Sequence, residues 1–181
     1  MQHSALPYEL RHFDIYKKAL RYNEESDANS KKATKRLVSD SVITPQFITF
    51  AKAAEEANTK AIQQLANYGA KFLDTYIEPT IQETDDSLNM LMGLTAQYQY
   101  RDTCHTKEWD WQLFKRIKSN IATLSIGIKA NSGLRDQTFD ELHKLIKLMW
   151  SNHSELLELS YRLSDMIACF EDWQSKRGNT P

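Results

Sequence analysis

One amphipathic pattern constrains the fold of this chain more than any other feature of its sequence. After Thr44 and Pro45, apolar or small residues recur at alternating steps of four and three for more than three heptads. Its positions are Phe47, Ala51, Ala54, Asn58, Ala61, Leu65, Tyr68 and Phe72. This spacing places all of them on one side of an α-helix and is typical of helices that pack as in coiled coils. The small residues allow a neighbouring helix to approach closely, and Asn58 is a polar position of the kind that fixes register.

Similar stripes predict further helices on both sides of this segment. Thr44 followed by Pro45 predicts a helix start, and Glu78-Pro79 predicts its end. Helices are then expected from Pro79 to about residue 101, from about 106 to 128, and from Thr138 to about 175. The last begins with a capping box, Thr138 to Glu141, and its polar run 151–154 leaves open whether it is continuous. Before Thr44 we expect two short helices, because the polar cluster 23–30 interrupts the apolar stripe.

The whole pattern predicts an all-α protein. The sequence has only five glycines and four prolines, and no β-type alternation is bounded by turn signals. Short connections between long helices favour an antiparallel up-and-down bundle, here with five to six helices of coiled-coil-like character. We expect a single domain over residues 1–181: short N-terminal helices in 1–43, a long-helix core in 44–176 and a flexible tail in 177–181. Gly69, Gly93 and Gly127 fall inside predicted helices, where close helix packing or a slight bend is the expected reason.

Composition is that of an ordinary soluble globular protein. Hydrophobic residues make up 41% and charged residues 26%, and the net charge of −1 does not favour nucleic acid as a partner. No signal-peptide pattern and no membrane-spanning apolar run is present in the sequence. Two cysteines are too few for a disulfide scaffold. These observations predict a cytoplasmic location and leave export by a signal-independent route open.

The sequence offers only incomplete catalytic or metal-binding arrangements. Glu9 with His12, and Asp140 with His143, have the spacing of di-iron bundle ligands, but no neighbouring helix supplies a carboxylate at a seam position. Cys104 is followed by His105, with no third group to orient the base. We therefore predict no catalytic residue, no metal ligand and no cofactor.

A dense basic cluster is the only patch of one sign. It could contact nucleic acid, anionic lipid or an acidic partner, but we favour a solvated helix face balanced by nearby carboxylates. The cluster consists of Lys31, Lys32, Lys35 and Arg36.

Aromatic residues supply the other candidate contact surface. Two pairs are spaced by two residues, so on a helix one member of each pair faces away from the core, and two further tryptophans lie off the main stripe of the last helix. Aromatic side chains are enriched at the buried centres of interfaces. The candidate partner-binding residues are Tyr98, Tyr100, Trp109, Trp111, Trp150 and Trp173. Additional apolar residues broaden the last helix beyond one stripe, which predicts a central or shared helix and hence a homo-oligomer. These are Leu145, Leu148, Leu157, Leu159 and Tyr161.

The segment "FITFAKAAEEANTKAIQQLANYGAKFLD", residues 47–74, resembles the amphipathic helix of phasins, the coat proteins of polyester granules. The resemblance lies in Ala, Asn, Lys and Leu usage at helical spacing and covers less than a fifth of the chain. It implies a helix that lies on a lipid or hydrophobic granule surface. The tryptophan-containing half departs from the family, so membership is not inferred.

Two functions of different classes follow from the sequence. The first is a non-enzymatic protein–protein interaction module of the adaptor, chaperone, inhibitor or secretion-associated type, with an aromatic-rich surface. The alternative is an amphipathic-helix binder of lipid or hydrophobic granules. An enzyme or metal-binding bundle ranks third.

Overall fold

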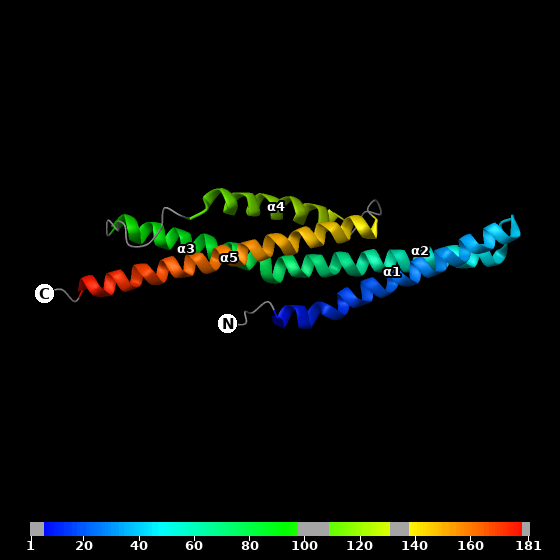
Figure 1. Cartoon of the computed structure of the whole chain (residues 1–181), viewed down its shortest axis with the longest axis horizontal. Helices are drawn as coiled ribbons and strands as arrows, with labels where there is room; N and C mark the ends of the chain where they lie inside the picture. Colours follow the sequence, from blue (N-terminus) through cyan, green and yellow to red (C-terminus); the bar gives the residue numbers. More distant parts are fainter. Residues whose placement is uncertain (1–5, 98–108, 131–137, 179–181) are drawn as a thin grey trace. The chain divides into compact units, whose positions relative to one another are not determined.

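The described chain is all-α. The computed structural model describes residues 6–97, 109–130 and 138–178, and within these ranges every regular element is helical (Figure 1). The elements are α1 (Leu6–Asp40), α2 (Pro45–Phe72), a π-helical segment η1 (Leu73–Ile77), α3 (Glu78–Gln97), α4 (Trp111–Ala130) and α5 (Phe139–Gly178). None of these helices contains a stretch long and apolar enough to cross a membrane.

Helix α1 corrects the prediction of two short helices in residues 1–43. It runs unbroken through the polar cluster 23–30, which contains neither glycine nor proline. Within this cluster the Ser26 side chain is buried, and its hydroxyl donates a hydrogen bond to the Ala54 carbonyl of α2 at 2.8 Å. The cluster is therefore part of a continuous helix that contacts α2 through Ser26, and not a connection.

Helix α2 begins where the sequence predicts. The Thr44 side chain accepts a hydrogen bond from the Phe47 amide at 3.2 Å, with Pro45 at the first helical position. The expected end at Glu78-Pro79 is wrong, because the chain stays helical from Pro45 to Gln97. Pro79 cannot donate to the carbonyl four residues back, and the wider π turn of η1 just before it accommodates that missing bond.

The last two helices have well-defined N-termini. Asp110 caps α4, since its carboxylate accepts from the Leu113 amide at 2.8 Å. Helix α4 therefore begins at Trp111, later than the expected start near residue 106. The predicted capping box of α5 is confirmed: the Thr138 amide donates to the Glu141 carboxylate at 2.9 Å, and the Glu141 amide donates to the Thr138 hydroxyl at 3.3 Å.

Helix α5 is continuous through its polar run 151–154. Asn152 is buried there, and its side-chain amide donates to the Leu148 carbonyl at 2.7 Å. The next residue, His153, is also buried, on the apolar stripe of the helix. The Ser154 hydroxyl likewise donates to the Trp150 carbonyl at 3.1 Å, so the side chains of Asn152 and Ser154 bond to the backbone of the uninterrupted helix.

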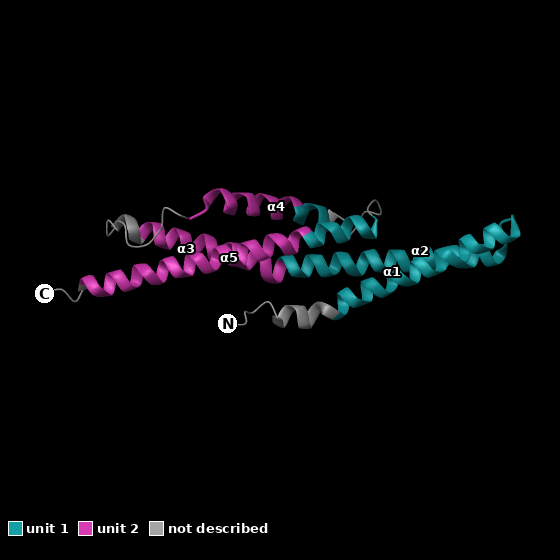
Figure 2. Cartoon of the chain, viewed as in Figure 1, with its two compact units in different colours: residues 1–73, 124–147 teal, residues 74–123, 148–181 magenta. Residues whose placement is uncertain are grey.

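The chain divides into two compact units (Figure 2). Unit 1 contains Met1–Leu73 and Leu124–Lys147, and unit 2 contains Asp74–Thr123 and Leu148–Pro181. The single domain over 1–181 stays a prediction, as does the flexible tail, most of which lies outside the described residues.

The core of unit 1 lies along the part of the α1–α2 hairpin farther from its turn, where the buried residues of α2 extend from Ala54 to Phe72. Gly69 of α2 provides the closest approach: a Cβ at this position would lie 3.2 Å from side-chain atoms of Ile128 and of Ile146. Buried α2 residues begin at Ala54, so the outer part of the hairpin has little buried surface. The buried hydrophobic residues of unit 1 on α2 are Ala54, Ala57, Ala61, Leu65, Ala66, Tyr68 and Phe72.

The core of unit 2 joins α3, α4 and α5. Lys118 of α4 forms an ion pair with Asp85 of α3 at 2.6 Å, and the Asn120 side-chain amide donates to Asn152 of α5 at 3.3 Å. Its largest fully buried side chains are Ile77, Ile117, Met149, Leu156, Leu159 and Phe170.

Candidate interaction surfaces

The aromatic pair at the start of α4 is split between core and surface. The Trp109 side chain is 5% exposed, whereas Trp111 is 40% exposed. Trp109 packs edge-on against both Trp111 and Phe114, with ring centroids 6.4 Å and 5.9 Å apart. One member of this pair is buried and the other exposed, as predicted, but Trp109 precedes α4, so the helical geometry on which the prediction rested does not apply. Of the two rings, only that of Trp111 offers substantial contact area, and the buried Trp109 supports it.

Of the other aromatic residues predicted to bind a partner, two lie on α5 and two lie outside the described residues. Trp150 of α5 is 37% exposed. Trp173, near the end of α5, is half-buried; it packs on Phe170 with ring centroids 5.5 Å apart, and the Arg177 guanidinium lies 5.2 Å from its ring centroid. Tyr98 and Tyr100 lie outside the described residues, as do Cys104 and His105.

Extra apolar residues of α5 are only partly covered. Leu159 is buried at 1% exposure, while Leu148 is 54% and Tyr161 is 39% exposed. Leu145 and Leu157 are half-buried. Helix α5 therefore has one fully buried stripe and an apolar margin that reaches solvent in this chain.

His143 belongs to an aromatic cluster in unit 1. Its Nε2 lies 2.7 Å from the Tyr16 hydroxyl, and its ring stacks on Phe139 with centroids 5.7 Å apart. Desolvation, and to a lesser degree Lys147, lower the pKa of His143. Within the described residues, no group of three or more His, Cys, Asp or Glu side chains could hold a metal ion. His143 is half-buried, and its described contacts are with Tyr16 and Phe139 of unit 1.

His153 is the buried histidine of unit 2, and it makes acid sensitivity a testable prediction. Desolvation lowers its pKa, and the Tyr76 ring packs edge-on against it at 6.3 Å. An unfolded histidine titrates near pH 6.5, so below that pH the unfolded chain binds a proton that the folded chain does not. We expect the free energy of unfolding to fall with a slope of up to about 1.4 kcal/mol per pH unit, from pH 6.5 toward the lowered pKa.

Urea denaturation over a pH series measures this slope, with His153→Phe as the comparison. Because phenylalanine does not titrate, the variant should lose the His153 contribution below pH 6.5, whatever its stability near neutrality. An identical pH dependence in the two proteins would contradict the assignment.

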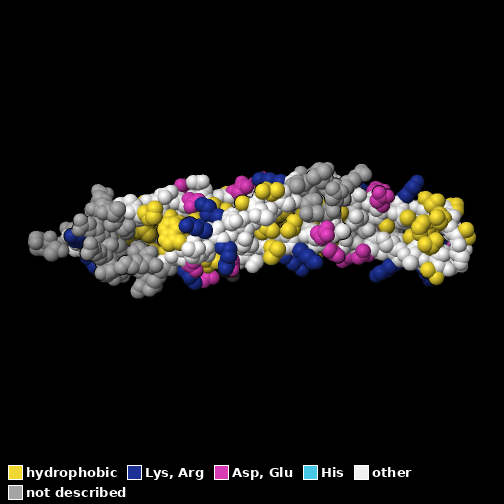
Figure 3. Space-filling view, turned by 90° about the horizontal axis from the view of Figure 1, so that it is seen from above, with side chains coloured by type: hydrophobic (Ala, Val, Ile, Leu, Met, Phe, Trp, Pro, Cys, Tyr) yellow, Lys and Arg dark blue, Asp and Glu magenta, His cyan; other side chains and the backbone are white. Residues whose placement is uncertain are grey.

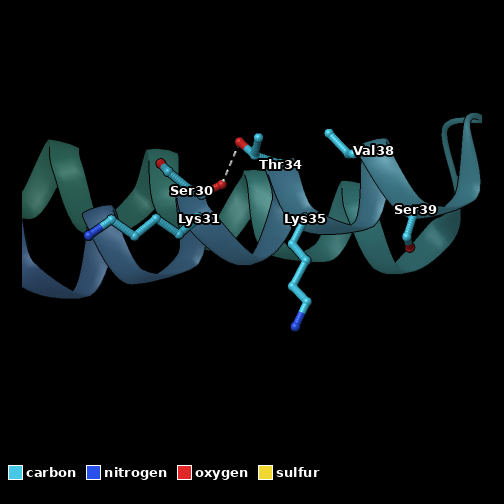
Figure 4. Close-up of a pocket in the computed structure, with 6 residues that line it drawn as sticks. All are labelled: Ser30, Lys31, Thr34, Lys35, Val38 and Ser39. Carbon is cyan, nitrogen blue, oxygen red and sulfur yellow. Dashed lines mark hydrogen bonds between the residues drawn. The ribbon is translucent and has the colours of Figure 1, made fainter.

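The basic cluster of α1 lies fully on the surface. Lys31, Lys32, Lys35 and Arg36 are all exposed, and the Lys32 ammonium lies 5.7 Å from the ring centroid of Phe50 on α2. Figure 4 shows that Lys31 and Lys35 point in different directions from a shallow hollow on α1. The hollow is lined by Ser30, Lys31, Thr34, Lys35, Val38 and Ser39. Because all six residues belong to one helix and its end, they form an open surface and not an enclosed ligand pocket. We call the four cations the basic flank.

The structure adds one surface that the sequence patterns missed. Large apolar side chains gather where α1 turns into α2, and Figure 3 shows hydrophobic atoms crowded at this end of the α1–α2 hairpin. Their exposures are Leu37 40%, Val38 76%, Val42 65%, Ile43 66% and Ile48 43%. We call these five residues the apolar tip. Helical periodicity does not indicate this surface, because its residues surround a turn. The sequence feature that does indicate it is a set of β-branched apolar residues in and beside a connection.

No protein-family model, no curated protein and no solved structure matches this chain. Its candidate function is therefore argued from the surfaces above.

Proposed function

We propose that this chain is a non-enzymatic protein–protein interaction module of the adaptor, chaperone, inhibitor or secretion-associated type. The observation that carries the proposal is the arrangement of Trp111 on Trp109. An exposed indole held by a buried aromatic neighbour is a rigid contact, so it loses little conformational entropy when a partner covers it. Asp110, the cap of α4, lies between the two tryptophans and fixes the backbone there.

The same proposal includes the arrangement of the helices and the oligomeric state. We propose an antiparallel up-and-down bundle with coiled-coil character, working in the cytoplasm as a homo-oligomer. The long seams of α2 and α5 support the bundle. The exposed Leu148 and Tyr161 of α5 support self-association, because an apolar margin beside a buried stripe suits a shared helix.

Self-association is tested by sedimentation velocity over a concentration series. We expect the wild-type chain to form a dimer or larger species, and Trp111→Ala to weaken its association by about tenfold or more, as for an interface hot spot. Ile126→Ala is the matched control, because Ile126 is an apolar side chain with 72% exposure that lies outside the aromatic surface.

Tryptophan quenching by acrylamide provides an independent readout. Trp111 should be accessible in the monomer and protected at high concentration. A chain that stays monomeric and whose tryptophans are all protected would contradict the proposal.

A second candidate function is binding to lipid or to a hydrophobic granule surface. The observation that favours it is the apolar tip beside the basic flank, since peripheral membrane binding combines buried apolar area with electrostatic attraction.

A further inference from the structure

The apolar tip concentrates much of the exposed hydrophobic surface of the described chain. Twelve large hydrophobic side chains are exposed within the described residues, and five of them lie between Leu37 and Ile48. In contrast, the neighbouring buried core of α2 begins only at Ala54. Exposed apolar clusters of this kind mark sites of contact with another surface.

The turn between α1 and α2 is hydrogen-bonded at both of its ends. Ser41 adopts a positive φ of 52°, and its amide donates to the Leu37 carbonyl at 3.1 Å, which closes the end of α1. Thr44 then caps α2. Val42 and Ile43 therefore project from a turn whose backbone is held on both sides.

Local packing does not account for these side chains. Ile43 precedes the N-cap and Ile48 is the fourth residue of α2, which are the positions of a hydrophobic staple. A staple would remove both from water, yet they are 66% and 43% exposed. Val38, at 76% exposure, has no part in such a contact.

Charge indicates what kind of surface the tip meets. Residues 28–54 contain the basic flank, Lys52 and a single carboxylate, Asp40, and so carry a net charge of +4. The whole chain has a net charge of −1, so the rest of the sequence carries −5. The part of the hairpin nearest the apolar tip therefore carries an excess of positive charge, and the carboxylates Asp27, Glu55 and Glu56 border it.

We propose that the α1–α2 hairpin binds an anionic phospholipid bilayer tip-first, with the apolar tip in the acyl boundary and the basic flank among the headgroups. The inference rests on the second candidate function and names its lipid and its contact residues. A second copy of the same tip is disfavoured because both tips carry positive charge. A bilayer supplies both of the required properties, an apolar interior and a negative surface.

The dimensions agree with this mode of binding. Within the basic flank, Arg36 lies four residues and Lys31 nine residues before Asp40, the last residue of α1. These separations are about 6 to 14 Å along the helix axis. Peripheral elements insert roughly 5 to 10 Å into the boundary between headgroups and acyl chains. When α1 stands on the bilayer, insertion of the tip places Lys35 and Arg36 at headgroup level and Lys31 and Lys32 just above, within about one Debye length.

Vesicle flotation of the full chain tests the proposal. Wild type should float with vesicles of phosphatidylcholine mixed with phosphatidylserine at low salt, and much less with phosphatidylcholine alone. Val42→Ser together with Ile43→Ser should lower the partition coefficient by about tenfold for each residue. Lys35→Glu together with Arg36→Glu should lower it by about fivefold or more for each charge and abolish the preference for phosphatidylserine.

Matched controls lie elsewhere in unit 1. Ile126→Ser removes an isoleucine of similar exposure, 72%, and Lys144→Glu with Lys147→Glu reverses two exposed charges on α5. Both controls should float like wild type, and far-UV circular dichroism checks that all variants remain helical.

The outcomes separate this inference from the function on which it rests. Absence of wild-type flotation would overturn both. Flotation that the tip variants leave unchanged would overturn the tip as the contact while the lipid-binding function stands. Tip variants that change sedimentation but not flotation would identify a protein contact instead, which also overturns the inference.

Discussion

Leu156→Ala is expected to lower the free energy of unfolding by about 2 to 5 kcal/mol. Leu156 lies on the seam of α5 in unit 2 with 0% exposure, between the equally buried Met149 and the nearly buried Leu163. Removing its side chain loses the transfer free energy of the deleted methyl and methylene groups and leaves a cavity that rigid neighbours fill only partly. Urea denaturation followed by circular dichroism measures the loss.

Leu148→Ala is the matched control on the same helix. Its side chain is 54% exposed, and the hydrogen bond from Asn152 goes to its backbone carbonyl, which the substitution retains. We expect a change within about 0.5 kcal/mol. Similar losses for the two variants would show that Leu148 is covered in solution, which supports a shared helix, while a small loss for Leu156→Ala would contradict the described core.

The seam spacing predicted which face of α2 is buried but not where burial begins: the seam residues from Ala61 to Phe72 are buried, whereas Phe47, Ala51 and Asn58 are only partly buried. On α5 the buried residues Leu142, Ile146, Met149, His153, Leu156, Leu163 and Phe170 follow the same kind of spacing, while the buried Leu159 lies beside it. The cap signals at Thr44 and Thr138 succeeded, since a cap is satisfied by amides three residues away.

Helix ends without a local cap were predicted less well. The polar cluster around Ser26 suggested a break, but tertiary contact with Ala54 keeps it helical. Pro79 suggested an end, but a π turn absorbs the proline within a continuous helix. In both places the outcome depends on packing or backbone adjustments that the identity of the residues does not reveal.

Of the candidate surfaces, one was predicted from the sequence and one was not. Trp109 is buried and Trp111 is exposed as predicted, but the prediction assumed that both lie on a helix, and Trp109 precedes α4. The apolar tip was not predicted from the sequence, because the exposure of side chains at a turn depends on whether another element covers them. Val42 and Ile43 could have been buried equally well by a neighbouring helix, and only the structure places them in solvent.

The three helical glycines could not be told apart from sequence, yet the structure predicts opposite effects for two of them. At Gly69 a Cβ would lie 3.2 Å from atoms of Ile128 and Ile146, whereas at Gly93 no described atom lies within 4 Å. Gly69→Leu would place three further carbon atoms in space that these isoleucines fill. Overpacking should cost about 1 to 3 kcal/mol and exceed the roughly 1 kcal/mol gained by removing a helical glycine.

Gly93→Leu makes the same chemical change where space is open. It should therefore keep only the propensity gain and raise the free energy of unfolding by about 0.5 to 1 kcal/mol. Urea denaturation of both variants beside wild type gives the comparison, and the opposite signs are the expected result. If Gly69→Leu were as stable as Gly93→Leu, α2 would not approach Ile128 and Ile146 as closely as described, and the packing of unit 1 would need revision. The contrast tests a tertiary contact through two substitutions of identical local chemistry, so helix propensity cancels between them.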